Sequence, residues 1–259
     1  MASHRKPSHS QTGSEHDPFE RLSDMELVRA KKGCAHVFGK QHRCRTDTIG
    51  HETPENRGPL DLVLDASEGF IPLWEQGTTL RWRFQEQSLL HFKNVDVAKG
   101  AIRTLLGSAL LAWGSSVPVR FAERKDTWDF EVVVRESDDC DINGCVLASA
   151  FFPDSGRHEL LIYPKMFSES KQEQVETVAH ELGHVFGLRH FFAQVRETAW
   201  PSVRFGKHKP FSIMNYGSKS VMTAADRSDL KLLYEKVWSG ELRQINGTRI
   251  KLVHPFHAK

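Results

Sequence analysis

The segment from Val175 to His190 constrains this chain more than any other, because it places histidines and a glycine at fixed intervals. His180 and His184 are four residues apart, so in a helix they lie one turn apart on the same face. Both imidazoles can then reach one metal ion at about 2.0–2.1 Å, the usual Zn–N distance. The opposite face carries four apolar residues, Val175, Val178, Leu182 and Val185. The spacing therefore predicts a helix with one face in the core and the other on a metal.

Gly187 decides what a third histidine can do. In a continuing helix, a histidine six residues after His184 would be unable to reach the same ion. Glycine tolerates the left-handed conformation that ends a helix and turns the chain sharply. We therefore expect His190 to approach the ion from another side. Three neutral histidines leave a fourth position for water, which is the layout of a catalytic zinc site.

Glu181 follows the first predicted ligand and would project beside the metal. Zinc lowers the pKa of its bound water towards about 7, so Glu181 is expected to take that proton as general base and pass it to a leaving amine as general acid. The alternative is a core helix with chance histidines and no metal. A full ligand and base pattern that falls on a predicted amphipathic helix favours the metal site.

Composition narrows the function without naming it. The chain has 259 residues, 39% of them hydrophobic, and a formal charge of +2 from 35 basic and 33 acidic residues. So small a charge argues against general nucleic-acid or membrane binding, and no apolar run approaches the ~18 residues of a membrane span. The 14 histidines are a weak signal in themselves, because His4, His9 and His16 fall in a polar start and His254 and His257 in the tail.

Hydrophobic periodicity predicts the main elements. Strands are expected over Thr79–Phe84, Val119–Phe121, Phe130–Val134, Val146–Phe152 and Leu160–Tyr163, and helices over Asp96–Trp113, Lys171–Gly187 and Ala224–Trp238. A short helix over Ser23–Lys32 and a loop over Thr53–Pro59 are also expected. Asn246-Gly247 indicates a hairpin within Leu242–Val253. The order of these elements predicts an α+β fold with one sheet and a few packed helices.

Four segments follow from this pattern. Residues 1–20 are polar and predicted to be disordered. Residues 21–75 form an N-terminal extension that is a candidate pro-segment, residues 76–238 the catalytic domain, and residues 239–259 a C-terminal tail with the hairpin. The first 21 residues contain no apolar stretch of the kind a secretory signal requires.

His180-Glu181-x-x-His184-x-x-Gly187-x-x-His190 resembles the signature of the metzincin zinc endopeptidases. Phe211–Gly217 is similar to the Met-containing turn of that family. The resemblance implies a zincin-like twisted mixed sheet with an active-site helix and a C-terminal helix, and it places Met214 beneath the metal. It also implies that Tyr216 serves as an additional zinc ligand or stabilises the oxyanion, as in astacin-like and serralysin-like members.

Other segments resemble the matrixins within that group. Gly144–Pro153 is similar to the matrixin edge strand, where an extended substrate adds by main-chain hydrogen bonds. The resemblance gives this role to Val146, Leu147 and Ala148, and Thr223–Tyr234 resembles the closing helix. Ser149 stands where the matrixins have a ligand of a second zinc, and His158 is nearly alone. We therefore expect one catalytic zinc and no structural zinc. Phe191, the residue after His190, fits neither the matrixin nor the astacin pattern, so the subfamily stays open.

The four cysteines form two close pairs. Cys140 and Cys145 flank a turn-like segment, and a disulfide between them is plausible in an oxidising compartment. Cys34 and Cys44 could pair likewise. Arg43-Cys44-Arg45-Thr46-Asp47 loosely matches the matrixin pro-segment motif, whose cysteine ligates the zinc and holds the enzyme latent. A disulfide or a free surface thiol is the alternative for Cys44.

The sequence therefore predicts a zinc-dependent endopeptidase that hydrolyses extended polypeptide. Its expected partner is a polypeptide substrate, with no nucleic acid and no membrane, and the chain is expected to be a monomer. The alternative is a catalytically weak or inactive zinc-containing interaction module on the same fold. The lack of a secretory signal in the first 21 residues favours a cytoplasmic or leaderless protein. The close cysteine pairs and the family resemblance favour an extracellular one.

Overall fold

The computed structural model describes residues 69–141, 144–189 and 221–258, with the shorter stretches 42–43, 62–65, 202–205 and 212–214 and residues 17 and 19. The α+β class is confirmed, although the strands form four sheets instead of one. Among the described residues, three of these sheets have three strands each and the fourth has five. In the described part of the chain, no helix is both long and apolar enough to cross a membrane.

The central sheet has the strand order β5-β4-β6-β10-β9. Its strands are β4 (Thr79–Phe84), β5 (Arg120–Glu123), β6 (Phe130–Val134), β9 (Ala148–Ser149) and β10 (His158–Ile162). All neighbouring pairs are parallel except β9 with β10. Side chains of β4 alternate between buried and half-buried, as the sequence predicts.

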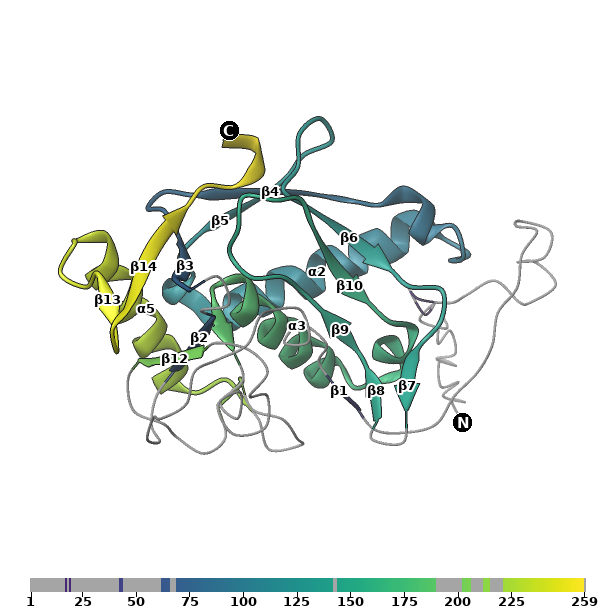
Figure 1. Ribbon diagram of the computed structural model, residues 1–259. Coiled ribbons are helices and arrows are strands. Elements are labelled where there is room, and N and C mark those ends of the chain that lie inside the picture. The colour runs from purple at the N-terminus through teal and green to yellow at the C-terminus, as the bar shows by residue number, and fades with distance from the viewer. Residues whose placement is uncertain are drawn as a thin grey trace, which may run out of the picture.

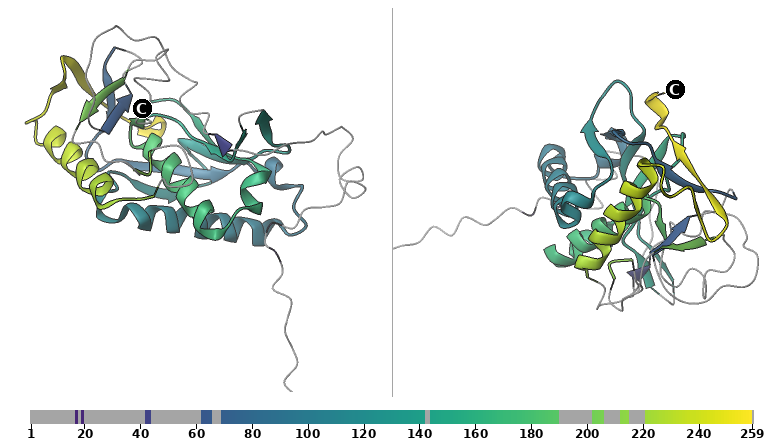
Figure 2. Two further views of the ribbon diagram at one scale, coloured as in Figure 1. Left: turned by 90° about the horizontal axis from the view of Figure 1, so that it is seen from below. Right: turned by 90° about the vertical axis from the view of Figure 1, so that its left-hand side faces the viewer.

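Three long helices lie on one side of this sheet (Figures 1 and 2). They are α2 (Val95–Trp113), α3 (Lys171–Val185) and α5 (Ala224–Trp238), each within two residues of its predicted bounds. Each begins at a side chain that caps it: Asn94 accepts from Val97 N, Ser170 from Glu173 N and Thr223 from Asp226 N. Their apolar faces and the inner face of the sheet form one core.

Helix α3 is held in its middle and at its C-terminal end by indole groups from other elements. Trp113 Nε1, at the end of α2, donates to Ala179 O at 2.8 Å, and Trp74 Nε1 donates to Val185 O at 2.7 Å. Trp74 belongs to β3 (Ile71–Trp74), whose residues are all buried. These contacts fix the position of the helix that carries the histidine motif.

The sequence predicts one continuous strand over Val146–Phe152, and this prediction is wrong. The chain forms β8 (Gly144–Val146), leaves the strand conformation at Leu147 and forms β9 over Ala148–Ser149. The break occurs because the two halves have different partners: β8 pairs with β7 (Asp139–Asp141), and β9 pairs with β10. The predicted disulfide is present across the β7–β8 pair, between Cys140 and Cys145.

The C-terminal segment forms a third sheet with strands distant in the sequence. The predicted hairpin is confirmed as β13 (Gln244–Ile245) and β14 (Thr248–Val253), with Asn246 and Gly247 at φ of 48° and 83°. Strand β14 also pairs in parallel with β3, joining residues 250–253 to residues 71–74. Near the start of the chain, Phe19 is buried, and its ring stacks on that of Phe167 with the two ring centres 4.1 Å apart. The predicted helix over Ser23–Lys32 and loop over Thr53–Pro59 lie outside the described residues.

Candidate metal centre

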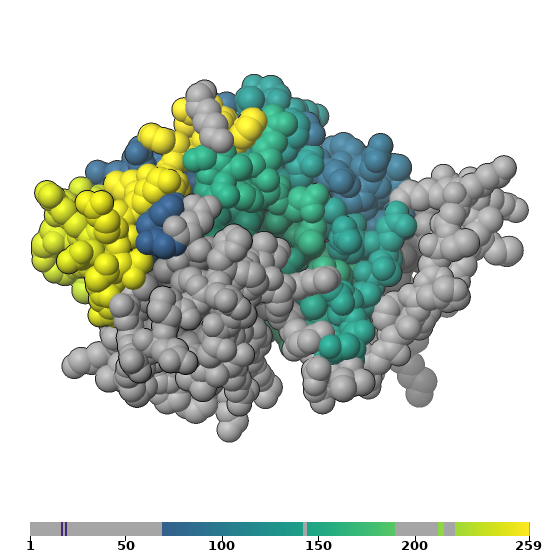
Figure 3. Space-filling view, in the orientation of Figure 1, coloured from purple at the N-terminus to yellow at the C-terminus, as the bar shows by residue number. Residues whose placement is uncertain are grey.

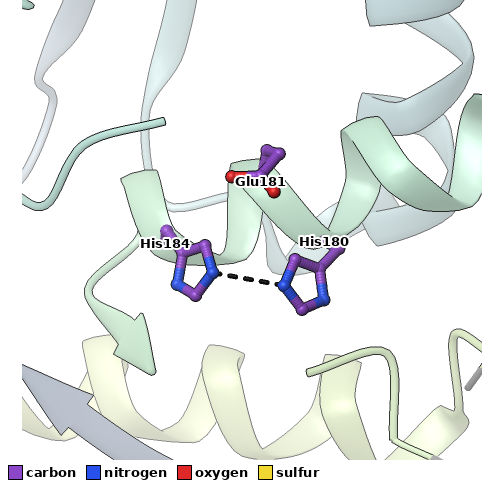
Figure 4. A group of neighbouring side chains, drawn as sticks. All are labelled: His180, Glu181 and His184. Atoms are coloured by element: carbon purple, nitrogen blue, oxygen red, sulfur yellow. Dashed lines mark hydrogen bonds between the residues drawn. The ribbon is translucent and has the colours of Figure 1, made fainter. Parts of the chain in front are cut away.

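Helix α3 carries His180 and His184 on one face, and both are buried, with exposures of 9% and 0%. The two rings face one another across a single helical turn (Figure 4). Val178, Leu182 and Val185 are buried on the apolar side, and Val175 packs against the core. The predicted division of the helix into a core face and a histidine face is therefore present.

Backbone carbonyls fix the tautomer of both imidazoles. His180 Nδ1 lies 2.7 Å from Ile213 O, and His184 Nδ1 lies 2.7 Å from Leu188 O. A carbonyl oxygen only accepts hydrogen bonds, so each Nδ1 must carry the proton. Each Nε2 then presents a lone pair, the form in which a neutral histidine binds a metal.

The two Nε2 atoms are 3.2 Å apart. Neither has a hydrogen to donate in this tautomer, so the contact is a convergence of two lone pairs. Two ligands at about 2.0–2.1 Å from a tetrahedral zinc are about 3.3–3.4 Å apart. The separation and the orientation of the rings therefore fit a shared zinc ion.

Glu181 is 1% exposed and belongs to the same cluster. One ligand atom from each of His180, Glu181 and His184 lies within 4.8 Å of the others. In Figure 4 the carboxylate lies to one side of the imidazole pair instead of between the rings. This position suits a group that acts on a molecule bound at the metal.

The turn after α3 follows the glycine prediction. Gly187 has φ of +91°, and a Cβ there would lie 3.0 Å from Leu73 Cδ2 and 3.3 Å from Pro72 O, so both conformation and space favour glycine. The chain then enters β11 (Leu188–Arg189), which pairs with β2 (Leu62–Asp65). The same turn brings Leu188 O back to His184. His190 follows β11 directly and lies outside the described residues.

Met214 lies under the helix turn that joins the two histidines. It is fully buried, and a Cβ on Gly183 would overlap Met214 Sδ. Gly183 therefore leaves the space that the methionine fills. The motif treats this position as variable, so the sequence pattern alone gives no reason to single out Gly183.

A hydrogen-bond network connects α5 to His180. Asp226 Oδ1 accepts from Ser212 Oγ at 2.5 Å, and Asp226 Oδ2 accepts from Thr223 Oγ1 at 2.7 Å. Ser212 Oγ in turn accepts from Met214 N at 3.1 Å. These bonds hold the Ser212–Met214 turn, whose Ile213 carbonyl anchors His180. The capping signal of Asp226 is readable in the sequence, whereas its link to His180 is not.

The residues predicted to border the substrate lie at two adjoining strands. Val146 ends β8, Ala148 begins β9, and Leu147 lies between them with its carbonyl accepting from Tyr163 N at 2.9 Å. Strand β9 is an edge of the central sheet, and all three residues are buried. The outer side of β8 pairs in parallel with β1 (His42–Arg43).

Three predicted site residues, His190, Tyr216 and Cys44, lie outside the described residues. Among the described residues, the His180 cluster is the one group of three candidate ligands close enough to hold an ion. His158 instead stacks on Phe151 and lies 3.3 Å from Asp154. The absence of a structural zinc stays a prediction.

The α+β fold and the buried histidine–glutamate cluster are those of a zinc metalloprotease. The family model described as Matrixin matches residues 73–215, more than half of the chain. The chain therefore belongs to the matrixin family, which decides the subfamily that its sequence motifs left open.

Two solved structures of myroilysin are similar to the chain, each at 14% sequence identity with a TM-score of 0.42. One comparison covers 66% of this chain and 98% of that chain, and the other 62% and 85%. A search of curated proteins finds no match to this chain.

Proposed function

We propose that this chain is a zinc-dependent endopeptidase that hydrolyses extended polypeptide. The observation that carries the proposal is the pair of Nε2 atoms 3.2 Å apart, each left unprotonated by an Nδ1–carbonyl contact, with buried Glu181 beside them. We place the activity in residues 76–238, with residues 1–20 and 21–75 preceding it and residues 239–259 as the tail. The active form is a monomer that acts without nucleic acid or membrane.

In this proposal His180, His184 and His190 hold the single zinc ion. Bound zinc would polarise the scissile carbonyl and lower the pKa of water. Glu181 accepts a proton from the attacking water and delivers it to the leaving amine. Tyr216 provides an extra ligand or a hydrogen bond to the oxyanion, while Met214 and Gly187 support the ligand geometry. No structural zinc takes part.

The substrate would lie as an extended strand along Val146, Leu147 and Ala148. Strand β9 ends the central sheet, and its neighbour β8 presents its outer side to another strand. Main-chain hydrogen bonds to a sheet edge bind polypeptide with little dependence on side chains. Phe152, whose ring is 5.5 Å from that of His184, links this edge to the metal ligands.

Glu181→Gln tests the proposed base. Because the amide cannot accept the proton, we expect hydrolysis of a peptide library to fall by about 10²–10⁴-fold while about one zinc per chain remains. Elemental analysis and the library assay, with and without a chelator, measure both quantities. Glu173→Gln, at an exposed position of the same helix, is the matched control and should retain activity.

The same assay separates the alternative functions. Zinc at about one per chain with no hydrolysis by the wild-type chain, even after removal of residues 1–61, which leaves β2 and β3 in place, would support the non-catalytic interaction module. A chain that binds no zinc would contradict both proposals and leave α3 as a core helix with histidines. Activity retained in Glu181→Gln would contradict the assignment of the base alone.

We further propose that Cys44 holds the full-length chain latent by ligating the zinc. Support comes from β1, which ends at Arg43, directly before Cys44, and which pairs with Cys145 and Val146 of β8. A strand at this position competes with substrate for the same edge. The position of β1 at this edge supports an inhibitory role for the segment that contains Cys44.

Cys44→Ser should raise the activity of the full-length chain, because a hydroxyl is a far poorer zinc ligand than a thiolate. Peptide hydrolysis by full-length protein measures the change. Cys34→Ser is the control: it should leave activity unchanged if Cys44 acts alone. Equal effects of the two variants would instead indicate a Cys34–Cys44 disulfide, and no effect of Cys44→Ser would refute latency through this thiol.

A further inference from the structure

Strand β14 has an outer edge that is only partly covered. Strand β13 pairs with Thr248 and Arg249, and Arg243 O accepts from Ile250 N at 2.9 Å. Beyond that point, β14 lies between β3 and an edge where no strand of the described chain pairs with Lys251–Val253. This segment lies at the periphery of the molecule, beyond β3 and the end of α5 (Figure 1).

The direction of the free backbone groups follows from the neighbouring bonds. Ile250 N points towards β13, whereas Val253 O points towards β3, where it accepts from Glu75 N at 3.2 Å. Backbone groups alternate sides along a strand, so residues two apart point the same way. Leu252 therefore directs its N–H and C=O to the same side of β14 as Ile250. At Ile250 this side is covered by Arg243, whereas at Leu252 it is the open edge.

A hollow of about 480 Å³ runs along this edge. On the side of α5 it is lined by the apolar side chains of Val237, Leu242 and Leu252. Leu252 is 37% exposed, although it is a large apolar residue. An apolar surface next to open main-chain groups is suited to binding an extended chain.

Cationic side chains line the same hollow from the other face of β14. Arg249 and Lys251 alternate with Ile250 and Leu252, and Lys251 Nζ lies 4.2 Å from the centre of the Phe70 ring. Arg243 extends the positive charge into an adjoining hollow of about 540 Å³. Glu241 is the one carboxylate that lines either hollow, and it is paired with Lys236. The yellow C-terminal surface in Figure 3 includes this region.

We propose that the open edge of β14 is a docking site for an extended polypeptide segment in which apolar and acidic residues alternate. Such a segment adds as a strand, bonding to Leu252 N–H and C=O. Its apolar side chains face Val237 and Leu242, and its acidic side chains face Arg249 and Lys251, because successive side chains of a strand point to opposite faces. Charge complementarity selects the acidic partner.

This site is distinct from the metal centre and does not depend on the proposed hydrolysis. The metal centre meets the N-terminal end of α5 through Asp226, whereas the docking edge lies against Val237 at the C-terminal end. A partner that docks on β14 therefore leaves the histidine pair uncovered.

The charged residues of the β14 edge have an alternative role, because charges on an exposed edge discourage aggregation. If protection from aggregation is their role and no partner docks there, no peptide should bind.

The first test measures binding of a fluorescently labelled octapeptide of alternating valine and glutamate to the full chain carrying Glu181→Gln, so that hydrolysis cannot consume the probe. We expect saturable binding by fluorescence anisotropy that weakens at least 10-fold between low and high salt. The Arg249→Glu and Lys251→Glu double variant should bind at least 10-fold more weakly. Absence of saturable binding at millimolar peptide overturns the proposal.

The matched control is the Arg124→Glu and Lys125→Glu double variant, which changes the charge equally at exposed positions after β5. It should bind the peptide as the parent chain does. An equal loss in both double variants shows that net charge alone attracts the peptide and overturns the docking site.

The second test distinguishes strand addition from loose electrostatic attraction without altering the protein. Two versions of the peptide carry N-methyl groups on alternate amides, in opposite phases. Only one phase removes the N–H groups that face β14, so one version should lose binding at least 10-fold and the other should keep it. Equal binding of the two versions overturns the proposed strand addition.

Discussion

At the scale of single residues, the candidate metal site depends on the close packing of the Met214 side chain against Gly183, which has no side chain. Met214 Sδ fills the space beside Gly183, one residue before His184, and Trp113 Cζ2 would lie 3.3 Å from a Cβ there. Helix α3 can approach both groups because Gly183 lacks a Cβ. The orientation of His180 and His184 depends on this approach, since the rings are anchored to the backbone carbonyls of Ile213 and Leu188 outside the helix.

Gly183→Ala should destabilise the chain by about 1–3 kcal/mol, because a methyl group would overlap Met214 in a packed core. Urea unfolding measures the change. Gly107→Ala is the matched control, since Gly107 also lies inside a helix but a Cβ at this position would meet nothing within 4 Å. It should stabilise the chain by about 0.5–1 kcal/mol. Similar effects from both substitutions would refute the steric role of Met214.

At the scale of elements, the start of α5 organises the turn beneath the metal. Asp226 completes a capping box with Thr223 and also accepts from Ser212 Oγ and Ile213 N. The carboxylate is 3% exposed, so its acceptor capacity is used within the protein. One helix cap thereby fixes the carbonyl that sets the tautomer of His180.

Asp226→Asn should lower stability by about 1–3 kcal/mol, because an amide cannot accept all the bonds of the carboxylate and leaves a buried donor unpaired. It should also weaken zinc binding by about 10–100-fold through His180. Unfolding without metal and competition with a chelator measure these effects separately.

Asn94→Ala provides the comparison for Asp226. Asn94 caps α2, which carries none of the proposed zinc ligands, and its loss should cost about 1 kcal/mol. Zinc affinity should be unchanged in this variant. A parallel loss of zinc affinity in Asn94→Ala would show that general destabilisation, and not the Asp226 network, controls the site.

At the scale of the whole molecule, β3 and the C-terminal residues close the core around α3. Tyr234 Oη of α5 donates to Phe186 O at 3.1 Å and accepts from Trp74 N at 3.4 Å. Trp238 Nε1 donates to Trp74 O at 2.9 Å. Buried Asp129 accepts from His257 N at 2.9 Å and from Arg81 N at 2.7 Å, which fastens the C-terminal residues to the central sheet.

Burial raises the pKa of Tyr234 well above its ordinary value of 10. A raised folded-state pKa means that the neutral phenol stabilises the fold below about pH 10 and that this stability is lost as the pH rises further. Urea unfolding from pH 8 to pH 11 should therefore show a decline above about pH 10. Tyr234→Phe should flatten that decline, at a cost of about 1–2 kcal/mol at neutral pH from the lost hydrogen bond.

Trp238→Phe serves as the control for Tyr234, because it removes a hydrogen bond to the same residue of β3 without removing an ionisable group. It should lower stability at every pH and keep the decline above about pH 10. An unchanged decline in Tyr234→Phe would show that another group causes the alkaline loss.

Short-range patterns determined much of this fold in advance. The spacing of apolar residues predicted α2, α3 and α5 nearly to the residue, because helix periodicity is a local property. Val146–Phe152 was mispredicted as one strand, since its partner changes at Leu147 and pairing is not written in a single segment. The parallel pairing of β14 with β3, over 170 residues away, has no local signal.

The sequence by itself determined the local geometry of the candidate site: the shared face of His180 and His184, with Glu181 between them, and the turn at Gly187 follow from helix geometry and glycine's conformational freedom. Only the tertiary structure decided which carbonyls orient the imidazoles, how Met214 fits Gly183, and which strands lie at the sheet edges. These features depend on contacts between segments far apart in the chain. Their formation requires the burial of the whole core, which no local pattern specifies.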